Sequence, residues 1–296
     1  MSNEIAVSVV IPCFNHGQFI RDAIASVEKC DKRAYELIIV NDGSTDSYTQ
    51  QVMKELEAEG YHVINQANQG LAAARNIGIR AGRGRYVLPL DADNLIRPNY
   101  IDAGIEILDK FPEVAVVYGR PAYFGEATDR RFDIGGEFDL PRLLRDNYID
   151  ACTVLRKSVF EACGGFDGNM PSQGYEDWDL WLTFAARGHN FYFVDEVLFD
   201  YRIRGDSMIH NAIARDEFPK VFEYFCAKHP LFALQARVTE LERELANRDR
   251  SRIFRFAKAY WNFKNAIFAR FSGKQTTQKT QPQVATDKAL TRQPTP

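Results

Sequence analysis

The chain lacks features that mark several large classes of protein. Its 296 residues include only five cysteines, and no two of them form a Cys-x-x-Cys pair. The scattered positions argue against a zinc site and for a reducing compartment. These cysteines are Cys13, Cys30, Cys152, Cys163 and Cys226.

Long apolar runs and a large excess of charge are also missing. No run approaches the roughly 18 apolar residues of a membrane-spanning helix, and the N-terminus Met-Ser-Asn-Glu-Ile does not resemble a signal peptide. We therefore expect a cytoplasmic protein whose contact with the inner face of a membrane, if any, is peripheral. The formal net charge is −3, so nucleic acid is not an expected partner.

The first 118 residues contain an alternation of strand-like and helix-like segments. Short apolar runs bounded by glycine or polar residues predict buried strands, and stretches with helical spacing lie between them. This alternation predicts an α/β fold with a mainly parallel, Rossmann-like sheet and helices on both faces. The expected strands are 6–12, 36–41, 61–65, 86–90 and 114–118, and the expected helices are 19–30, 49–59, 70–81 and 100–111.

The pattern changes after residue 118. Residues 119–150 are irregular and predict a long loop or a small insertion over the sheet. The later expected elements are a strand and helix in 153–163, a helix at 175–187, strands at 190–194 and 197–202, and a helix at 211–229.

The C-terminal part has a different composition. Leucine and valine recur every three or four residues from 234 to 245, which is compatible with a short coiled coil. Residues 250–271 are basic and aromatic, so they predict a helix that either lies on an anionic membrane or packs on protein. We expect a catalytic domain at 1–230, a helical extension at 231–272 and a disordered, polar tail at 273–296.

Two carboxylates follow the expected strand at 86–90. Asp91 and Asp93 would point to the same side of an extended backbone, about 7 Å apart. Their repulsion, roughly 2 kcal/mol at an effective dielectric constant near 20, would be relieved by a divalent cation with oxygen ligands. Ligands of open α/β sheets bind beyond the carboxyl ends of strands, where this pair falls. Alternatively, Asp91 caps a loop and Asp93 caps a helix.

Other segments have both a functional and a structural interpretation. Asp42 follows the second expected strand and could accept a hydrogen bond from a base or ribose, or belong to a helix-capping turn. Arg75 could face a diphosphate or be a solvated charge on a helix.

The first turn of the expected helix at 175–187 is acidic. Glu176 and Asp177 could simply be acids that the helix dipole stabilises at this end, or one of them could serve as a general base. Trp178 could offer a platform for a sugar ring or belong to the core.

Taken together, these segments resemble the family 2 glycosyltransferases with the GT-A fold. The similarity extends over roughly residues 7–207, and the motifs occur in the family's order and spacing. The matching motifs are Val9-Val-Ile-Pro-Cys-Phe-Asn15, Val40-Asn-Asp-Gly-Ser-Thr-Asp46, Asn68-Gln-Gly-Leu-Ala-Ala-Ala-Arg-Asn-Ile-Gly78, Asp91-Ala-Asp93, Gly164-Gly-Phe-Asp167 and Glu176-Asp-Trp-Asp-Leu180.

The resemblance implies an inverting, metal-dependent and non-processive transferase that takes a nucleotide sugar, with a UDP-sugar as the expected donor. The acceptor would be a glycan or a lipid-linked glycan. The residues implied to bind the nucleotide sugar are Pro12, Phe14, Asn15, Asp42, Gly70, Arg75, Asp91 and Trp178.

The resemblance also implies a metal site and a catalytic base. Asp93 and Asp91 would hold Mn²⁺ or Mg²⁺ beside the donor diphosphate. Asp177 would be the base that takes a proton from the acceptor hydroxyl, with Glu176 as the second candidate.

The chain departs from the usual family pattern at a few positions. Cys13 and Phe14 replace more common residues, although Phe14 can still stack on a base. Arg204 stands in place of a frequent histidine, which places the metal or phosphate role of that position in doubt. His210 is a candidate replacement as a metal ligand. The Gln-x-x-Arg-Trp motif of processive synthases is absent, so we expect single-residue addition.

Alternatives from other classes remain open. A non-catalytic protein that binds a sugar nucleotide, or a membrane-associated scaffold, would share the motifs without turnover. Nucleotidyl transfer is less favoured because the segment 12–17 is not a glycine-rich loop. A dinucleotide-binding oxidoreductase is disfavoured because the Gly82-Arg-Gly84 segment precedes its strand and does not follow it.

Overall fold

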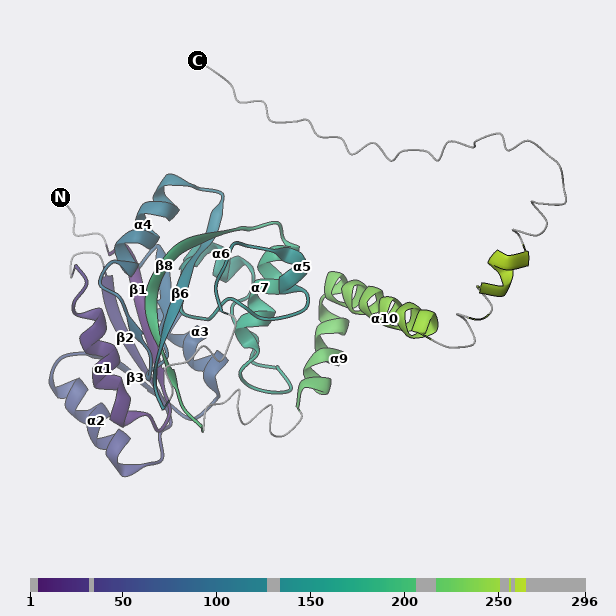
Figure 1. The fold of residues 1–296 in the computed structure, drawn as a ribbon. Coiled ribbons are helices and arrows are strands. Elements are labelled where there is room, and N and C mark those ends of the chain that lie inside the picture. The colour runs from purple at the N-terminus through teal and green to yellow at the C-terminus, as the bar shows by residue number, and fades with distance from the viewer. Residues whose placement is uncertain are drawn as a thin grey trace, which may run out of the picture. The chain divides into compact units, whose positions relative to one another are not determined.

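A computed structural model shows strands and helices alternating along the first part of the chain and helices near its end (Figure 1). By its internal contacts the chain divides into two units, Met1–Thr239 and Glu240–Pro296. The predicted boundaries at residues 230 and 272 stay predictions. The structure describes residues 5–31, 35–126, 134–205, 217–250, 256 and 259–264, with the side chains of 247–250 excepted.

Four parallel strands form the N-terminal half of the sheet, and three helices connect them. The first strand, with the sequence Val-Ser-Val-Val-Ile-Pro-Cys, is buried along its whole length, as its apolar composition predicts. The strands are β1 (Val7–Cys13), β2 (Tyr35–Asp42), β3 (His62–Gln66) and β4 (Tyr86–Pro89), and the helices are α1 (Gly17–Val27), α2 (Ser47–Ala58) and α3 (Leu71–Ala81).

The order of the strands creates a crevice. The sheet has the order β3-β2-β1-β4-β7-β6-β8-β5, and β1 pairs in parallel with both β2 and β4. The chain therefore proceeds from β1 outward through β2 and β3, and then returns to the other side of β1 with β4. Such a switch point opens a crevice at the carboxyl ends of the strands on either side of it.

The second half of the sheet is mixed. Strand β7 is antiparallel to both of its neighbours, whereas β6 and β8 are parallel to each other. Four of the seven strand pairings are parallel, which agrees with the predicted, mainly parallel α/β sheet. These strands are β5 (Leu95–Ile96), β6 (Val114–Gly125), β7 (Val154–Arg156) and β8 (Asn190–Ile203).

Two predicted elements differ from those observed. The predicted strands at 190–194 and 197–202 are one strand, β8, because both segments pair with β6. Register shifts around Arg120 absorb the extra residues between them. Strand β6 extends to Gly125, so the irregular stretch predicted from residue 119 begins later.

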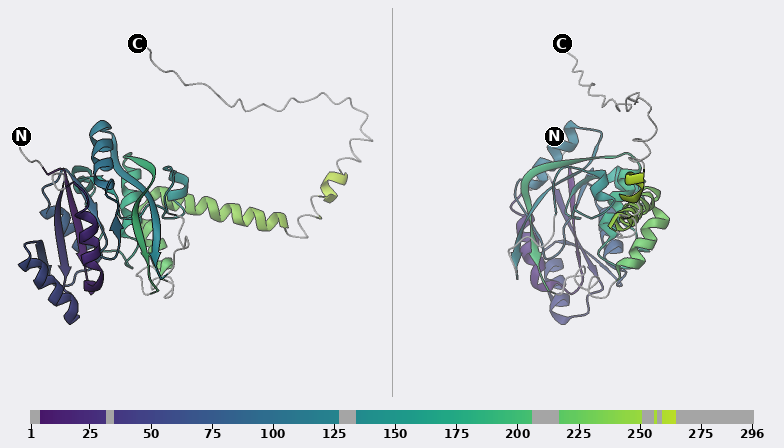
Figure 2. Two further views of the ribbon diagram at one scale, coloured as in Figure 1. Left: turned by 60° about the vertical axis from the view of Figure 1, so that its left-hand side comes forward. Right: turned by 45° about the vertical axis from the view of Figure 1, so that its right-hand side comes forward.

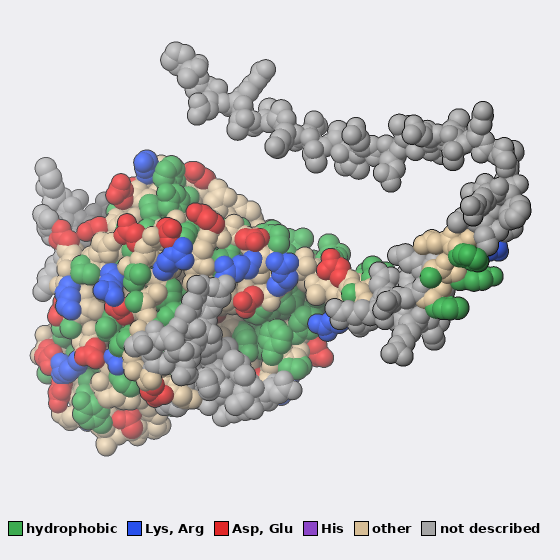
Figure 3. Space-filling model, viewed as in Figure 1, with side chains coloured by type: hydrophobic (Ala, Val, Ile, Leu, Met, Phe, Trp, Pro, Cys, Tyr) green, Lys and Arg blue, Asp and Glu red, His purple; other side chains and the backbone are tan. Residues whose placement is uncertain are grey.

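Helices cover both faces of the sheet (Figure 2). Ile20 of α1 and Val52 of α2 belong to the hydrophobic cluster on one face, and Phe160 and Trp181 belong to the cluster on the other. The remaining helices of this region are α4 (Tyr100–Lys110), α5 (Leu140–Leu143), α6 (Lys157–Ala162) and α7 (Glu176–Ala186). Lys and Arg side chains are interspersed with Asp and Glu over the face seen in Figure 3.

A glycine brings α3 close to the sheet. A Cβ atom on Gly78 would lie 2.3 Å from a methyl carbon of Val10 and 2.9 Å from one of Val40. The missing side chain lets α3 pack directly over β1 and β2. Arg75, one turn earlier in α3, thereby comes to line the crevice.

Helix α9 (Phe218–Lys228) is fastened to the α/β region by charged and aromatic contacts. Lys228 donates to Asp179 at 2.8 Å and also to Asp167, and Phe225 packs against Trp178. The part of the predicted helix that precedes residue 217 lies outside the described residues. Helix α9 is therefore part of the first unit's core.

Helix α10 (Pro230–Arg250) carries the predicted apolar repeat. Phe232 is buried, but the side chains at the repeat positions are 40–62% exposed. None of the helices in the described ranges is both long and apolar enough to cross a membrane. The exposed repeat residues are Leu234, Val238, Leu241 and Leu245, and Leu231 before them is also exposed.

Candidate active site

The crevice contains a pocket of about 370 Å³. Its walls come from the loops after β1, β2 and β4, the start of α3, the turn before α7 and the end of β8. Most of the residues predicted for the site lie here, although they are widely separated in the sequence. The predicted residues that line the pocket are Pro12, Phe14, Asp42, Gly70, Arg75, Asp91, Asp93, Glu176 and Asp177.

Two of the predicted site residues that the structure describes, Asn15 and Trp178, do not line it. His210 lies outside the described residues. Asn15 has a positive φ of 57° and points its side chain at the loop after β2, where Oδ1 accepts from the backbone N–H groups of Thr45 (2.8 Å) and Asp46 (3.2 Å). Asn15 therefore joins two loops of the pocket, and contact with a donor would be indirect.

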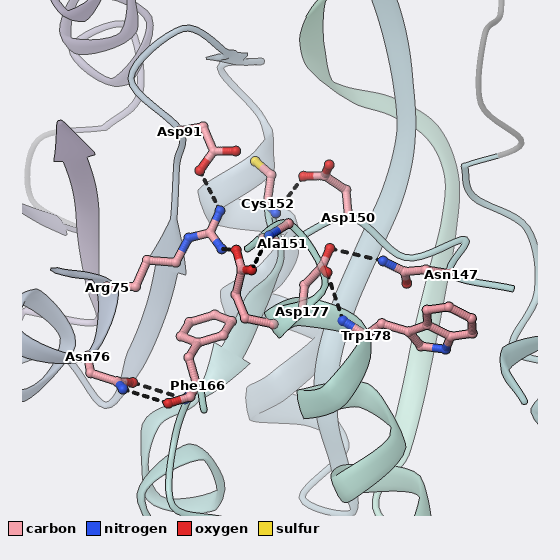
Figure 4. Close-up of polar contacts among 12 residues, drawn as sticks. Arg75, Asn76, Asp91, Asn147, Asp150, Ala151, Cys152, Phe166, Asp177 and Trp178 are labelled. Atoms are coloured by element: carbon pink, nitrogen blue, oxygen red, sulfur yellow. Dashed lines mark hydrogen bonds and ion pairs between the residues drawn. The ribbon is translucent and has the colours of Figure 1, made fainter. Parts of the chain in front are cut away.

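Trp178 belongs to the core, which was the alternative to a platform for a sugar ring. Its side chain points away from Arg75 (Figure 4), and Nε1 donates to the carbonyl oxygen of Leu143 at 2.7 Å. The ring packs edge-on against Phe225 and Phe232. Because the ring is only 4% exposed, it has no face available to a sugar.

Asp42 joins the end of β2 to the start of α3. Its carboxylate accepts from Gln66 Nε2 at 2.7 Å and from the backbone N–H groups of Gln69 (2.8 Å) and Gly70 (2.9 Å). The helix-capping role considered for this segment belongs to Asp46, which accepts from the Thr49 N–H at 2.7 Å. Asp42 thus holds the pocket wall together and still lines the pocket.

Arg75 is enclosed between two carboxylates. Its guanidinium donates to Asp91 at 2.5 Å (Figure 4) and to Glu176 at 2.7 Å, and it lies 5.2 Å from the centre of the Phe166 ring. Burial opposes the positive charge, but Asp91 and Glu176 outweigh it and raise the pKa of Arg75. Since its side chain is 3% exposed, Arg75 mainly organises the carboxylates around it.

Asp91 and Asp93 lie on a turn, not on the extended backbone that their spacing suggested. The backbone N–H of Asn94 donates to the carbonyl oxygen of Asp91 at 3.0 Å and closes the turn. Asp93 accepts from Arg204 Nη1 at 3.0 Å. Burial, together with the Asp91 carboxylate, raises the pKa of Asp93 against the opposing effects of His16 and Arg204.

These two aspartates fit a divalent cation. Both line the pocket, and each uses one carboxylate oxygen in its ion pair, which leaves its other oxygen as a potential ligand. The described residues contain no cluster of three or more His, Cys, Asp or Glu with the geometry of a metal site. The remaining ligands would therefore come from a bound molecule or from water.

Two further carboxylates lie near each other beside Arg75 (Figure 4). Asp177 accepts from Asn147 Nδ2 at 3.1 Å, and Asp150 accepts from the Cys152 N–H at 2.8 Å. Burial and the nearby negative charges raise the pKa of Asp177 to about 8. Burial and the Asp91 carboxylate raise the pKa of Asp150 to about 7. Partly accessible carboxyl groups with such pKa values are suited to proton transfer near neutral pH.

The structure also adds residues that the sequence did not assign to the site. Asp150 comes from the irregular stretch before β7, where no motif marks it. His16 lies next to Arg204, with 3.0 Å between Nε2 and Nη1. Of Asp150, His16 and Arg204, only Arg204 was noted in the sequence, because it stands where the family usually has histidine.

Comparison with known proteins agrees with this architecture. The sequence profile of the family described as Glycosyl transferase family 2 matches residues 8–165, which is more than half of the chain. The chain belongs to this family and is a glycosyltransferase.

The sequence relatives are bacterial and archaeal glycosyltransferases. An uncharacterized glycosyltransferase of Rickettsia typhi is 29% identical over 234 residues, which cover 75% of this chain and 72% of the relative. TuaG of Bacillus subtilis, whose name assigns it to teichuronic acid biosynthesis, is 28% identical over 69% of this chain and 82% of its own length.

Solved structures of S. aureus TarS have a similar fold. Residues 1–349 of TarS in complex with UDP-GlcNAc match with a TM-score of 0.61 and 17% sequence identity, over 78% of this chain and 66% of that one. The complex of the same fragment with UDP matches with a TM-score of 0.58 and 16% identity, over 78% of this chain and 65% of that one. The fold is therefore of the GT-A type.

Proposed function

We propose that the protein is an inverting glycosyltransferase that moves a sugar from a nucleoside-diphosphate sugar, a UDP-sugar by preference, to a hydroxyl group of a glycan or lipid-linked glycan. The observation that carries this proposal is one pocket that holds the Asp91/Asp93 pair and Asp177. The TarS complexes with UDP and UDP-GlcNAc support the choice of donor by similarity of fold.

The donor would extend across the pocket from β1 to α7. Pro12 and Phe14 line its β1 side, and Phe14 is 42% exposed, so its ring is available to stack on a base. Asp42 and Gly70 line the adjoining wall. The diphosphate would then lie at the turn of Asp91 and Asp93.

Of the two adjacent acidic residues, Asp177 is the better base. Glu176 is only 3% exposed and is held by the positive charge of Arg75 at Oε1 and by the Gly174 N–H at Oε2, whereas the oxygens of Asp177 accept from two neutral donors, Asn147 Nδ2 at 3.1 Å and the Trp178 N–H at 2.7 Å. Asp177 is partly accessible and has a raised pKa. Its carboxylate would take the proton of the acceptor hydroxyl as the hydroxyl oxygen bonds to the anomeric carbon and the carbon–oxygen bond to the diphosphate breaks on the opposite face.

Asp91 and Asp93 would hold Mn²⁺ or Mg²⁺ beside the diphosphate. The bound ion supplies Lewis-acid stabilisation of the negative charge on the leaving group. Arg75 would keep Asp91 and Glu176 in place, which fixes the geometry of both sides of the pocket.

The proposed acceptor and location follow from the relatives and from the second unit. The name of TuaG connects a relative to teichuronic acid biosynthesis, which supports a glycan or lipid-linked acceptor. Within the second unit, Phe256, Tyr260, Trp261 and Phe263 are each at least 59% exposed. Lys264 lies 5.5 Å from the centre of the Trp261 ring, and exposed aromatic side chains beside basic ones suit the surface of an anionic membrane. We therefore propose a cytoplasmic enzyme that contacts the inner face of the membrane through residues 250–271.

A donor-hydrolysis assay tests the proposed reaction. We would incubate the purified protein with UDP-, GDP-, dTDP- and CDP-sugars and Mn²⁺ and measure release of the free nucleotide. The proposal predicts release from one nucleotide class, loss of release in Asp177→Asn, and normal release in the control Asp109→Asn, which lies outside the pocket and alters contacts with Arg85 and the Tyr86 hydroxyl. Equal release by the Asp177 and Asp109 variants would show that the base lies elsewhere.

A further inference from the structure

Two arginines at the end of β8 face the turn that carries the proposed metal ligands. Arg202 holds the backbone of this turn, since its Nε donates to the carbonyl oxygen of Asp93 at 2.9 Å and its N–H donates to Asn94 Oδ1 at 2.9 Å. Arg204 instead binds the Asp93 carboxylate, with 3.0 Å between Nη1 and Oδ2. Both guanidinium groups lie within 5 Å of the centre of the Phe19 ring, at 4.7 and 4.8 Å. Arg202 thus shapes the turn, and Arg204 forms an ion pair with Asp93, one of the proposed metal ligands on the turn.

This arrangement leaves little negative charge for a metal ion in the donor-free protein. Asp91 is paired with Arg75 at 2.5 Å and Asp93 with Arg204 at 3.0 Å. A divalent cation beside Asp93 would meet the Arg204 guanidinium as a like charge. Moreover, two carboxylates are few ligands for Mg²⁺ or Mn²⁺, which usually complete their coordination with substrate phosphates and water.

A nucleoside diphosphate would change this balance. Its phosphate oxygens are acceptors that match the planar fork of an arginine, and they bring negative charge into the pocket. Arg204 is partly accessible, with 11% of its side chain exposed, and it lines the same pocket as Asp91 and Asp93. A diphosphate at the turn would therefore compete with Asp93 for Arg204.

We propose that Arg204 is a positioning residue that couples donor binding to metal binding. In the donor-free protein Arg204 neutralises Asp93. When a nucleoside diphosphate binds, Arg204 shifts to its phosphates and releases the Asp93 carboxylate for the divalent cation. This inference rests on the proposed function, because it takes Asp91 and Asp93 as the metal ligands. It predicts weak metal binding without the nucleotide, and linkage requires the metal to strengthen nucleotide binding by the same factor.

Calorimetric titration of the full chain tests this coupling. Mn²⁺ would be titrated into the wild type, Arg204→Ala and the control Arg83→Ala, each with and without saturating UDP. Arg83 is a matched control because its side chain is 73% exposed and its ion pair with Glu36 lies outside the pocket. A circular-dichroism spectrum and a melting curve would verify that each variant is folded.

UDP should tighten Mn²⁺ binding at least about tenfold in the wild type and in Arg83→Ala. In Arg204→Ala, Mn²⁺ should bind more tightly without UDP, and UDP should tighten it by a smaller factor than in the wild type, because the phosphates still supply ligands but no longer release Asp93 from Arg204. Equal coupling in Arg204→Ala and the wild type would overturn the inference and leave the proposed function intact. If UDP binds but Mn²⁺ does not bind the wild type under any condition, both the inference and the proposed metal dependence fail. If UDP does not bind at all, the proposed donor is wrong and the inference fails with it.

Discussion

Glu176 and Asp177 are neighbours in the sequence but meet different surroundings. Glu176 is 3% exposed and forms a buried ion pair with Arg75, whereas Asp177 accepts from a neutral amide, Asn147, and keeps access to the pocket. A buried ion pair serves to hold geometry, because removal of one partner leaves an uncompensated charge. The two acids therefore have different roles, although both open the same helix.

This difference predicts distinct phenotypes for the two variants. Asp177→Asn should keep donor affinity and lower the rate of transfer by about 10²–10⁴-fold, which is the usual contribution of a general base. Glu176→Gln should lower stability as well as activity, because Arg75 loses its buried partner. The measurements are the turnover number, the donor Kd and the free energy of unfolding. Transfer that survives in Asp177→Asn and disappears only in Glu176→Gln would reverse the assignment.

The raised pKa values of Asp177 and Asp150 predict how stability depends on pH. An unfolded aspartate titrates near 3.8, whereas Asp177 titrates at about 8 and Asp150 at about 7 in the folded protein. Between these limits the native state binds more protons than the unfolded state, so the free energy of unfolding should fall as the pH rises. Denaturant titrations at about pH 5.5 and pH 8.5 should differ by about 1 kcal/mol or more.

The variant Asp177→Asn should show a smaller difference between the two pH values, because an amide does not titrate. Asp167 has a pKa lowered to about 2, so its contribution changes only at more acidic pH. A free energy of unfolding that rises between pH 5.5 and 8.5 would contradict this account of the two carboxyl groups.

Most of the residues that the sequence predicted for the site line one pocket, for a physical reason. Asp42 is the last residue of β2 and Asp91 follows β4, and the carboxyl ends of these parallel strands meet at one edge. The turn at Asp91 and Asp93 and the buried position of Trp178 depend on contacts in the folded protein, which the spacing of residues in the sequence does not reveal. Asp150 could not be predicted, since the path of the irregular stretch before β7 is set by packing.

At the scale of elements, α9 supports α7, the helix that carries Glu176 and Asp177. Lys228 of α9 bridges Asp179, which lies in α7 two residues after Asp177, and Asp167, which lies in the turn after α6. Phe166, next to Asp167, forms the surface on which Arg75 lies. A single lysine thus connects α9 to two segments that position the pocket.

Replacement of this lysine tests the support. Lys228→Met should lower the free energy of unfolding by about 1–3 kcal/mol, because Asp179, with 2% of its side chain exposed, keeps a buried charge without this partner. Lys220→Met is a matched control on an exposed part of the same helix. It should change the free energy of unfolding by less than about 0.5 kcal/mol. Urea denaturation measures both variants. Equal losses in the two variants would show that the bridge does not stabilise α9.

The elements that the sequence predicted best are those with local signals. Helix α2 begins after Asp46, whose side chain caps it, and β1 is an apolar run with turn residues after it. The union of two expected strands into β8 was not predictable, because it depends on pairing with β6, about 75 residues earlier in the chain.

At the scale of the whole molecule, the predicted membrane contact lies at the C-terminal end. Deletion of residues 250–296 should weaken binding to anionic vesicles and leave donor hydrolysis unchanged, because the pocket lies within the first unit. Each lost Lys or Arg near an anionic surface should cost about 1 kcal/mol of binding free energy. Vesicle co-sedimentation measures this, with uncharged vesicles as the control. Equal binding of the full chain and the truncated chain to anionic vesicles would reject the membrane contact.

The most direct test of the proposed function is a thermal-shift measurement with UDP, GDP, dTDP, CDP and NAD, each with and without Mn²⁺. A ligand that binds only the native state raises the free energy of unfolding by RT ln(1 + [L]/Kd), and so raises the melting temperature. We predict a shift with UDP that grows with Mn²⁺, and a loss of the Mn²⁺-dependent part in Asp93→Ala. A shift with another diphosphate would change the donor class. No shift with any nucleotide, or a UDP shift that is the same with and without Mn²⁺, would contradict a metal-assisted nucleotide-sugar site in this pocket.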